Sequence, residues 1–267
     1  MLRAVHNGPV FRHELHADLS RLGVAPGDTL LVHAAMSTVG WVCGGATDVV
    51  LALLDTVGPT GTVVVPAHTP DNRDPARWTQ YPLGTVPERW WSSLREHLPP
   101  YDRDLTPSGG MGVIAERVRT WPGATRSDHP QTSFAAVGPA AEKLMAGHTL
   151  ASQLGEDSPL ARLAEARARV LLLGVGYDRC TAFHLAEYRL PSPRMRTNSC
   201  VMATGRGREW VTYETVQLDD SDFARLGHDF ETATSLVRQG PVGNARSRLF
   251  GLDEAVGFAR SWFLANR

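Results

Sequence analysis

The chain has 267 residues, of which 42% are hydrophobic and 21% are charged, and its formal net charge is −1. These values are typical of a soluble globular protein and argue against a nucleic-acid-binding or membrane-binding surface. The three cysteines are too few for a disulfide framework, and no segment is apolar enough for a signal peptide or a membrane span. We therefore expect a cytoplasmic protein.

The first quarter of the chain predicts helices that alternate with buried strands. Apolar residues recur at helical spacing in FRHELHADLSRLGV (11–24) and in GGATDVVLALLDTVGPTG (44–61). Apolar runs indicate buried strands in GDTLLVHAAMS (27–37) and TVVVPAHT (62–69). This order is typical of an α/β protein.

An irregular excursion follows at about residues 70–109. It is rich in proline, tryptophan and turn residues, and it contains one short predicted helix near PERWWSSLREHL (87–98). A segment this long and irregular is more often functional than merely tolerated. We expect it to lie on the substrate side of the protein.

The remaining chain returns to alternating elements and ends with a hairpin and two helices. The strand signal is strongest in RVLLLGVG (169–176), and RTNSCVMATGRGREWVTYETVQL (196–218) predicts an antiparallel hairpin. The other predicted elements are a strand at 132–138 and helices at 110–121, 139–148, 158–168, 219–236 and 252–265. We expect one α/β domain over residues 1–267, with a mostly parallel central sheet flanked by helices.

Motifs of several other enzyme classes are absent or incomplete. No G-x-S-x-G occurs, which argues against an α/β-hydrolase, and GVGYDR (174–179) lacks the third glycine of a dinucleotide-binding loop. HELH (13–16) has the wrong histidine spacing for a zinc protease, and no cysteine pair has metal-ligand spacing. We expect no metal site.

Polar or glycine-rich turns follow three of the predicted strands. They are HAAMSTVGWVCGG (33–45), PAHT (66–69) and YDRCTAFH (177–184). Ligands of open α/β sheets bind outside the carboxyl ends of the strands, so these turns are expected to wall one cleft. The third turn contains Cys180 and His184, with Glu187 just beyond, and these residue types suit a nucleophile, a base or a metal ligand.

Six segments in order along the chain resemble the aminoglycoside 3-N-acetyltransferase family. They are HAAMSTVGWVCGG, TPSGGMGVIAERVR, RSDHPQTSFAAVG, GEDSPLARL, VLLLGVGYDRCTAFHLAEYRLP and GPVGNARSRLFGLDEAVGFARSWF. The family often has HSS where this chain has HAAM. The resemblance implies an acetyl-CoA-dependent N-acetyltransferase whose fold is not the GNAT fold.

The catalytic hypothesis places His184 as the general base that takes the proton of the acceptor amine. A carboxylate on the other ring nitrogen would fix the tautomer. We prefer Glu214 for this role, because Glu187 is an i, i+3 neighbour of His184 and such side chains usually lie side by side on one helix. Glu187 then contacts the substrate. Cys180 would lie one helical turn from His184 and could instead carry the acyl group. We expect direct transfer.

The resemblance and the strand-end positions also give candidate binding residues. Those expected to contact acetyl-CoA, the only cofactor we expect, are His33, Ser37, Thr38, Val39, Thr69, Met111, Arg126, Phe134 and Thr181. Carboxylates and aromatics suited to a polycationic acceptor are Asp71, Asp74, Asp157, Glu187, Trp78, Tyr81 and Tyr188.

The resemblance implies acetylation of the 3-amino group of a 2-deoxystreptamine aminoglycoside by a monomer or homodimer, and hence antibiotic resistance. Two alternatives remain open. One is a biosynthetic acyltransferase that modifies another natural-product amine. The other is a catalytically idle relative that binds CoA without turnover.

Overall fold

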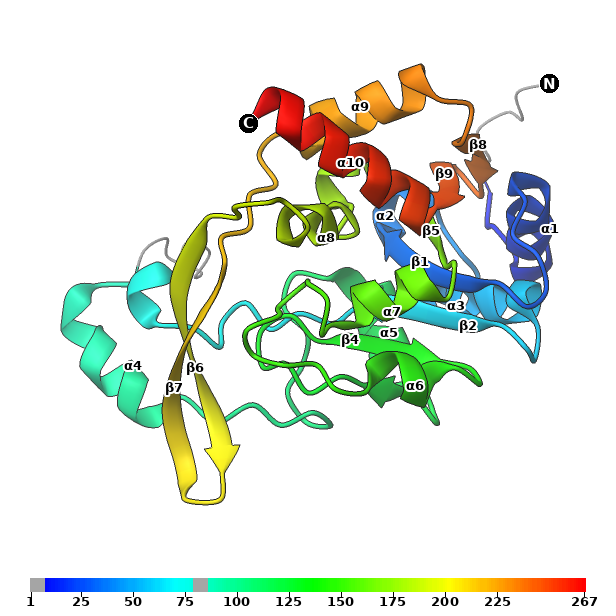
Figure 1. Ribbon diagram of the computed structural model, residues 1–267. Coiled ribbons are helices and arrows are strands. Elements are labelled where there is room, and N and C mark those ends of the chain that lie inside the picture. The colour runs from blue at the N-terminus through cyan, green and yellow to red at the C-terminus, as the bar shows by residue number, and fades with distance from the viewer. Residues whose placement is uncertain (1–7, 79–85) are drawn as a thin grey trace.

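The computed structural model describes residues 8–78 and 86–267, and its body is a seven-stranded sheet covered by helices on both faces (Figure 1). The strand order is β3-β4-β2-β1-β5-β9-β8. The strands are β1 (Thr29–Ala34), β2 (Thr62–Pro66), β3 (Thr125–Arg126), β4 (Phe134–Val137), β5 (Arg169–Leu173), β8 (Arg238–Val242) and β9 (Ala245–Gly251).

The sheet is mixed, so the prediction of a mostly parallel sheet is wrong. Only β1 pairs in parallel with its neighbours, β2 and β5, and the other four pairings are antiparallel. Hydrophobic runs indicate that a strand is buried but carry no information on its direction. Strands β3, β8 and β9 were not predicted; β3 has only two residues, and β8 is a short edge strand that contains Pro241.

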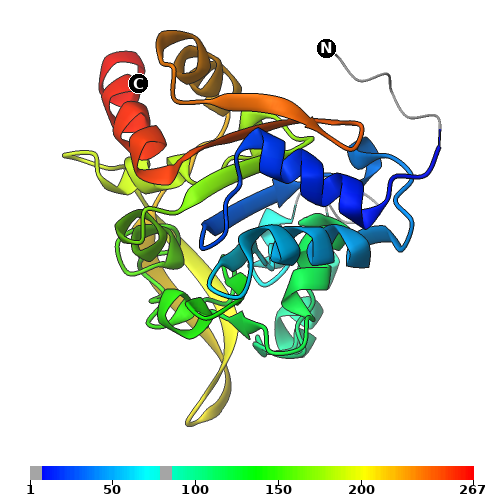
Figure 2. The same ribbon diagram turned by 90° about the vertical axis from the view of Figure 1, so that its right-hand side faces the viewer.

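Alternate residues of the central strands point to opposite faces of the sheet and build two cores. Val63 and Val65 pack under α1 (Arg12–Leu22), α3 (Gly45–Val57) and α5 (Gly112–Arg119). Val64 belongs to the opposite core, under α6 (Ala141–Met145), α7 (Pro159–Glu165), α8 (Phe183–Tyr188), α9 (Phe223–Ala233) and α10 (Leu252–Asn266). Figure 2 shows α1 beside the ribbon of β8 and β9.

The late antiparallel hairpin is present as β6 (Met195–Thr204) and β7 (Gly207–Val216), and it projects from the body beside α4 (Trp91–His97) (Figure 1). The Asn72 amide pairs with the Val201 backbone through two hydrogen bonds of 2.8 and 2.9 Å, much as a neighbouring strand would. The described part of the 70–109 excursion is thereby fixed against the hairpin.

The remaining short elements are α2 (Met36–Val39) and the 3₁₀ turns η1 (Pro75–Arg77), η2 (Glu88–Trp90) and η3 (Tyr177–Arg179). Helix α2 and turn η3 lie in segments expected to wall the cleft, and turn η1 lies in the excursion expected on the substrate side. Within the described residues, no helix has both the length and the apolarity to cross a bilayer.

Candidate active site

A cavity of about 640 Å³ lies at the carboxyl ends of β1, β2 and β5. Because these three strands run in parallel, the segments that follow them meet at one edge of the sheet. Its lining includes residues 33–37 at the end of β1 and just beyond it, His68 after β2 and residues 178–181 after β5. The structure therefore brings the three strand-end turns to one site.

The walls of this cavity are largely apolar, with a glycine-rich entry. Gly110 and Gly112 line it with φ angles of 72° and 85°, a backbone conformation that favours glycine. Gly112 begins α5, so the first backbone N–H groups of this helix lie at the entry. Apolar lining residues are Val32, Met36, Val65, Pro66, Ile114, Val175 and Phe223.

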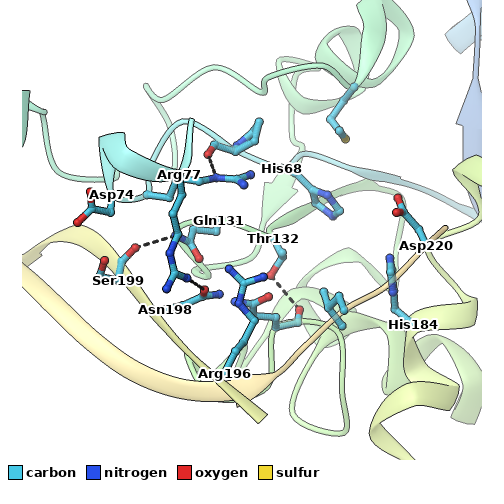
Figure 3. Close-up of a pocket in the computed structure, with 15 residues that line it drawn as sticks. His68, Asp74, Arg77, Gln131, Thr132, His184, Arg196, Asn198, Ser199 and Asp220 are labelled. Atoms are coloured by element: carbon cyan, nitrogen blue, oxygen red, sulfur yellow. Dashed lines mark hydrogen bonds between the residues drawn. The ribbon is translucent and has the colours of Figure 1, made fainter. Parts of the chain in front are cut away.

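A second cavity, of about 330 Å³, adjoins the first and extends toward the hairpin and the excursion (Figure 3). Apart from Pro70, the residues that line only this cavity are polar, and they include Arg73, Arg77 and Arg196. The residues that border both cavities are His68, Met111, Thr132, His184, Leu218 and Asp220. His184 therefore lies where the two cavities meet.

His184 is held by a chain of charged contacts behind the cleft. Its Nδ1 lies 2.7 Å from Oε2 of Glu187, which is only 2% exposed. An ionised carboxylate only accepts hydrogen bonds, so Nδ1 carries the hydrogen and Nε2 is free to take a proton. The other carboxylate oxygen of Glu187 accepts from the Asp219 backbone N–H at 3.1 Å and from the Arg267 guanidinium.

The expected contact between Glu214 and His184 is wrong. Glu214 is exposed on β7, where its carboxylate accepts a hydrogen bond from the Thr197 hydroxyl. Glu187 occupies the Nδ1 position instead, because an i, i+3 spacing on α8 puts both side chains on one face of the helix. Glu187 lines neither cavity, so the expected substrate contact is also absent.

Cys180 does not precede His184 on the same helix, because α8 begins only at Phe183. The thiol belongs to the core, and burial raises its pKa to about 12. A thiol that remains protonated is a poor nucleophile, so the environment of Cys180 argues against an acyl carrier. Among the described residues, no three His, Cys, Asp or Glu side chains are grouped closely enough to hold a metal ion.

His68 is a site residue that sequence reasoning did not single out, although it lies in the strand-end turn PAHT. It is half-buried where the cavities meet, and its Nε2 is a buried nitrogen with no hydrogen-bond partner. Burial, with neighbouring His184 and His33, lowers the pKa of His68 to about 3, so the ring is neutral. A neutral imidazole can donate a hydrogen bond to a substrate oxygen.

The expected cofactor residues divide into two groups. His33, Ser37, Met111 and Thr181 line the larger cavity, and the Thr181 hydroxyl lies 3.1 Å from a ring nitrogen of His33. The others, which line neither cavity, are Thr38, Val39, Thr69, Arg126 and Phe134.

Local contacts explain why those residues stay out of the cleft. Val39 and Phe134 belong to the core, and the Thr38 and Thr69 hydroxyls donate to backbone carbonyls. The buried guanidinium of Arg126 donates to the carbonyls of residues 67, 103 and 106. The Arg126 guanidinium therefore stabilises the fold through these backbone contacts.

The expected acceptor residues are dispersed. Asp71 and Asp157 are exposed outside both cavities, and the Tyr188 hydroxyl bonds to Thr215. Asp74 lines the smaller cavity, but Arg95 neutralises it at 2.8 Å. Trp78 is buried and lines neither cavity, and Tyr81 lies outside the described residues.

Comparisons with known proteins agree on one family. Residues 31–264 match the family described as aminoglycoside 3-N-acetyltransferase. The chain is 40% identical to the SPbeta prophage-derived aminoglycoside N(3')-acetyltransferase-like protein YokD of Bacillus subtilis, over 97% of this chain and 94% of that protein. It is 38% identical to aminoglycoside N(3)-acetyltransferase IX of Micromonospora chalcea, over 97% and 95% of the two chains.

Solved structures share the fold. The crystal structure of YokD superposes with a TM-score of 0.92 at 39% identity, over 97% of this chain and 95% of that chain. The structure described as AAC-IIIb binary with CoASH gives a TM-score of 0.85 at 35% identity, over 97% of each chain.

Proposed function

The chain belongs to the aminoglycoside 3-N-acetyltransferase family, and from that premise we propose that it transfers an acetyl group from acetyl-CoA directly to a primary amine. The observation that carries the proposal is the His184–Glu187 pair at the junction of the two cavities. The larger cavity is assigned to acetyl-CoA and the smaller to the amine.

The larger cavity suits the pantetheine arm of acetyl-CoA. Its apolar walls fit the methylene chain, and residues 110–112 offer backbone N–H groups at the start of α5. The unpaired Nε2 of His68 is a candidate donor for the carbonyl oxygen of the thioester. A relative solved with CoASH supports the choice of this co-substrate.

When bound, acetyl-CoA supplies an activated acyl group as a thioester. His184 accepts a proton from the amine through Nε2 as the nitrogen attacks the carbonyl carbon. The carbon–sulfur bond then breaks, and the imidazolium returns the proton to the departing sulfur. Glu187 stabilises the positive charge on the ring during this sequence.

Direct transfer is favoured over an acyl-enzyme because of the state of Cys180. Its pKa of about 12 keeps the thiol protonated at neutral pH. A catalytically idle relative would have no use for the His184–Glu187 pair at the junction of the cavities. The geometry therefore favours an active enzyme with one base and two substrates bound together.

Two acceptor classes remain candidates. The family favours the 3-amino group of a 2-deoxystreptamine aminoglycoside, because several relatives carry that activity in their names. The arginine-rich lining of the smaller cavity favours the alternative, which is another natural-product amine. Acetylation of an aminoglycoside would give antibiotic resistance, and acetylation of another natural-product amine would be a step of biosynthesis.

The test is a thiol-release assay of the purified protein with acetyl-CoA against a panel of amines, with the mass of each product measured. We expect release of CoA together with a product that has gained one acetyl group on nitrogen. Thiol release without an acetylated product, or no release with any amine, would contradict the proposal.

A further inference from the structure

The smaller cavity carries an excess of positive charge where a polycation would have to bind. Arg73, Arg77 and Arg196 line it. Granting the proposed acetyl transfer, on which this step rests, we infer that the acceptor is an amine that also carries an oxyanion, either a carboxylate or a phosphoryl group. The arginines bind the oxyanion, and the amine lies at His184.

The three guanidinium groups come from two parts of the chain that the fold brings together. Arg73 and Arg77 belong to the excursion, and Arg196 belongs to β6 of the hairpin. Arg77 donates to the Thr197 carbonyl at 2.9 Å and to the Asn198 side chain at 3.2 Å, which fixes the excursion on the hairpin at this point. Both the excursion and the hairpin therefore hold this arginine cluster (Arg73, Arg77 and Arg196) in place.

None of the three arginines forms an ion pair with a described carboxylate. Among the described residues, Arg73 donates only to the Pro70 carbonyl, and the Arg196 side chain forms no hydrogen bond. Burial and mutual repulsion lower the pKa of both: Arg196 acts on Arg73, and Arg77 acts on Arg196. Partly buried cations without a counter-ion are suited to an anionic ligand.

The carboxylates of this cavity do not offset the arginines. Asp74 is neutralised by Arg95, which leaves Asp220 as the one unpaired carboxylate among the described lining residues. The sequence of residues 79–85, TQYPLGT, contains no acidic residue. An aminoglycoside with several ammonium groups would meet three like charges here and one opposite charge.

The charges are also separated along the cavity. Figure 3 shows Arg77 and Arg196 at one end, with Asn198 beside them, and His184 with Asp220 at the other. Asp220 suits the ammonium form of the acceptor, and His184 suits its deprotonation. The arrangement matches a molecule with an amine at one end and an oxyanion at the other.

The experiment compares amines that differ only in the oxyanion. Glucosamine 6-phosphate is paired with glucosamine, β-alanine is paired with its amide, and kanamycin represents the polycations. The wild-type chain is compared with Arg196→Gln, Arg196→Lys and Arg196→Glu, and kcat/KM is measured by thiol release. Arg206→Gln serves as the matched control, because Arg206 lies at the exposed turn of the same hairpin and pairs with Glu209.

We expect the oxyanion-bearing member of at least one pair to react better than its partner. Arg196→Gln then lowers its kcat/KM by about 10- to 100-fold, the scale of one charge-assisted hydrogen bond. Arg196→Lys restores part of the loss, and Arg206→Gln changes nothing. The two pairs distinguish a carboxylate from a phosphoryl acceptor. Arg196→Glu should raise kcat/KM for kanamycin.

Binding separates failure of this inference from failure of the proposed function. Calorimetric titration with glucosamine 6-phosphate and β-alanine reports oxyanion binding without turnover. Arg196-dependent binding with no acetylation of any amine would overturn the proposed function alone. Efficient acetylation of kanamycin, with equal rates inside each pair and no effect of Arg196→Gln, would overturn this inference alone. Neither binding nor acetylation would overturn both.

Discussion

Substituting Glu187 by glutamine tests the assignment of the carboxylate that orients His184. The Glu187 carboxylate accepts from His184 Nδ1 at 2.7 Å, from the Asp219 N–H at 3.1 Å and from Arg267. A glutamine can still accept from Asp219 and Arg267 through its oxygen, but it then turns an NH₂ group toward Nδ1. Nδ1 must become the acceptor, so the hydrogen moves to Nε2 and the ring loses its capacity as a base.

The expected loss of turnover is ~10²–10⁴, the scale of general base catalysis. Stability should fall less than for a fully buried ion pair, because Arg267 is 23% exposed at its side chain and keeps its bond to Asp222. We expect the free energy of unfolding to fall by about 1–3 kcal/mol, below the roughly 3–5 kcal/mol of a fully buried broken pair. In a chain of this size that lowers Tm by roughly 2–4 °C for each kcal/mol.

The assay is thiol release with acetyl-CoA and an amine that the wild-type chain accepts, together with thermal unfolding of each variant. Glu214→Gln is the matched control, because it makes the same chemical change on an exposed carboxylate of the hairpin. We expect its turnover to equal that of the wild type. A collapse of Glu214→Gln with a normal Glu187→Gln would refute the reasoning and restore Glu214 as the orienting group.

Three further predictions concern Cys180, Arg267 and the buried histidines. Cys180→Ala should keep near-wild-type turnover. Iodoacetamide at pH 8 should label exposed Cys43 but not Cys180, because burial raises the pKa of the Cys180 thiol to about 12. Loss of activity in Cys180→Ala, or peptide mapping that finds Cys180 alkylated, would contradict this. Arg267→Gln should lower turnover less than Glu187→Gln and lower the free energy of unfolding by about 1–3 kcal/mol; equal losses in the two variants would show that Arg267 does more than position Glu187. Burial lowers the pKa of His33 to about 3 and of His129 to about 4, so both stay neutral in the fold while the unfolded chain binds protons below pH 6.5. The free energy of unfolding therefore keeps its full value above pH 6.5 and falls on acidification, by about 1 kcal/mol for each histidine at pH 5.5. A urea midpoint at pH 5.5 equal to or above that at pH 7.5 would contradict this.

The position of the site could be predicted from the sequence because local patterns mark the ends of strands. The turns after 29–34, 62–66 and 169–173 are visible as polar residues that follow apolar runs, and the parallel pairing of these strands puts them at one edge. His184 was predicted as the base for the same reason. The late hairpin was equally visible, because glycines mark its turn between two alternating strands.

Features that depend on distant packing were not predictable. Arg267 contacts Glu187 across 80 positions of sequence, and no local pattern indicates that contact. The arginine cluster forms because contacts such as those of Asn72 with Val201 and of Arg77 with Thr197 hold the excursion against the hairpin. Glu214 was preferred over Glu187 because side chains at i and i+3 were expected to lie side by side without meeting. The helix instead gives them a hydrogen bond.

The central claim is that His184 removes the proton of the amine during direct transfer, and the rate of the chemical step tests it most directly. Single-turnover acetyl transfer is followed by rapid quench for the wild-type chain and for His184→Ala, with CoA affinity measured in parallel. We expect His184→Ala to bind CoA as the wild type does and to form product ~10²–10⁴ times more slowly. Equal rates of product formation in the two proteins would contradict the claim.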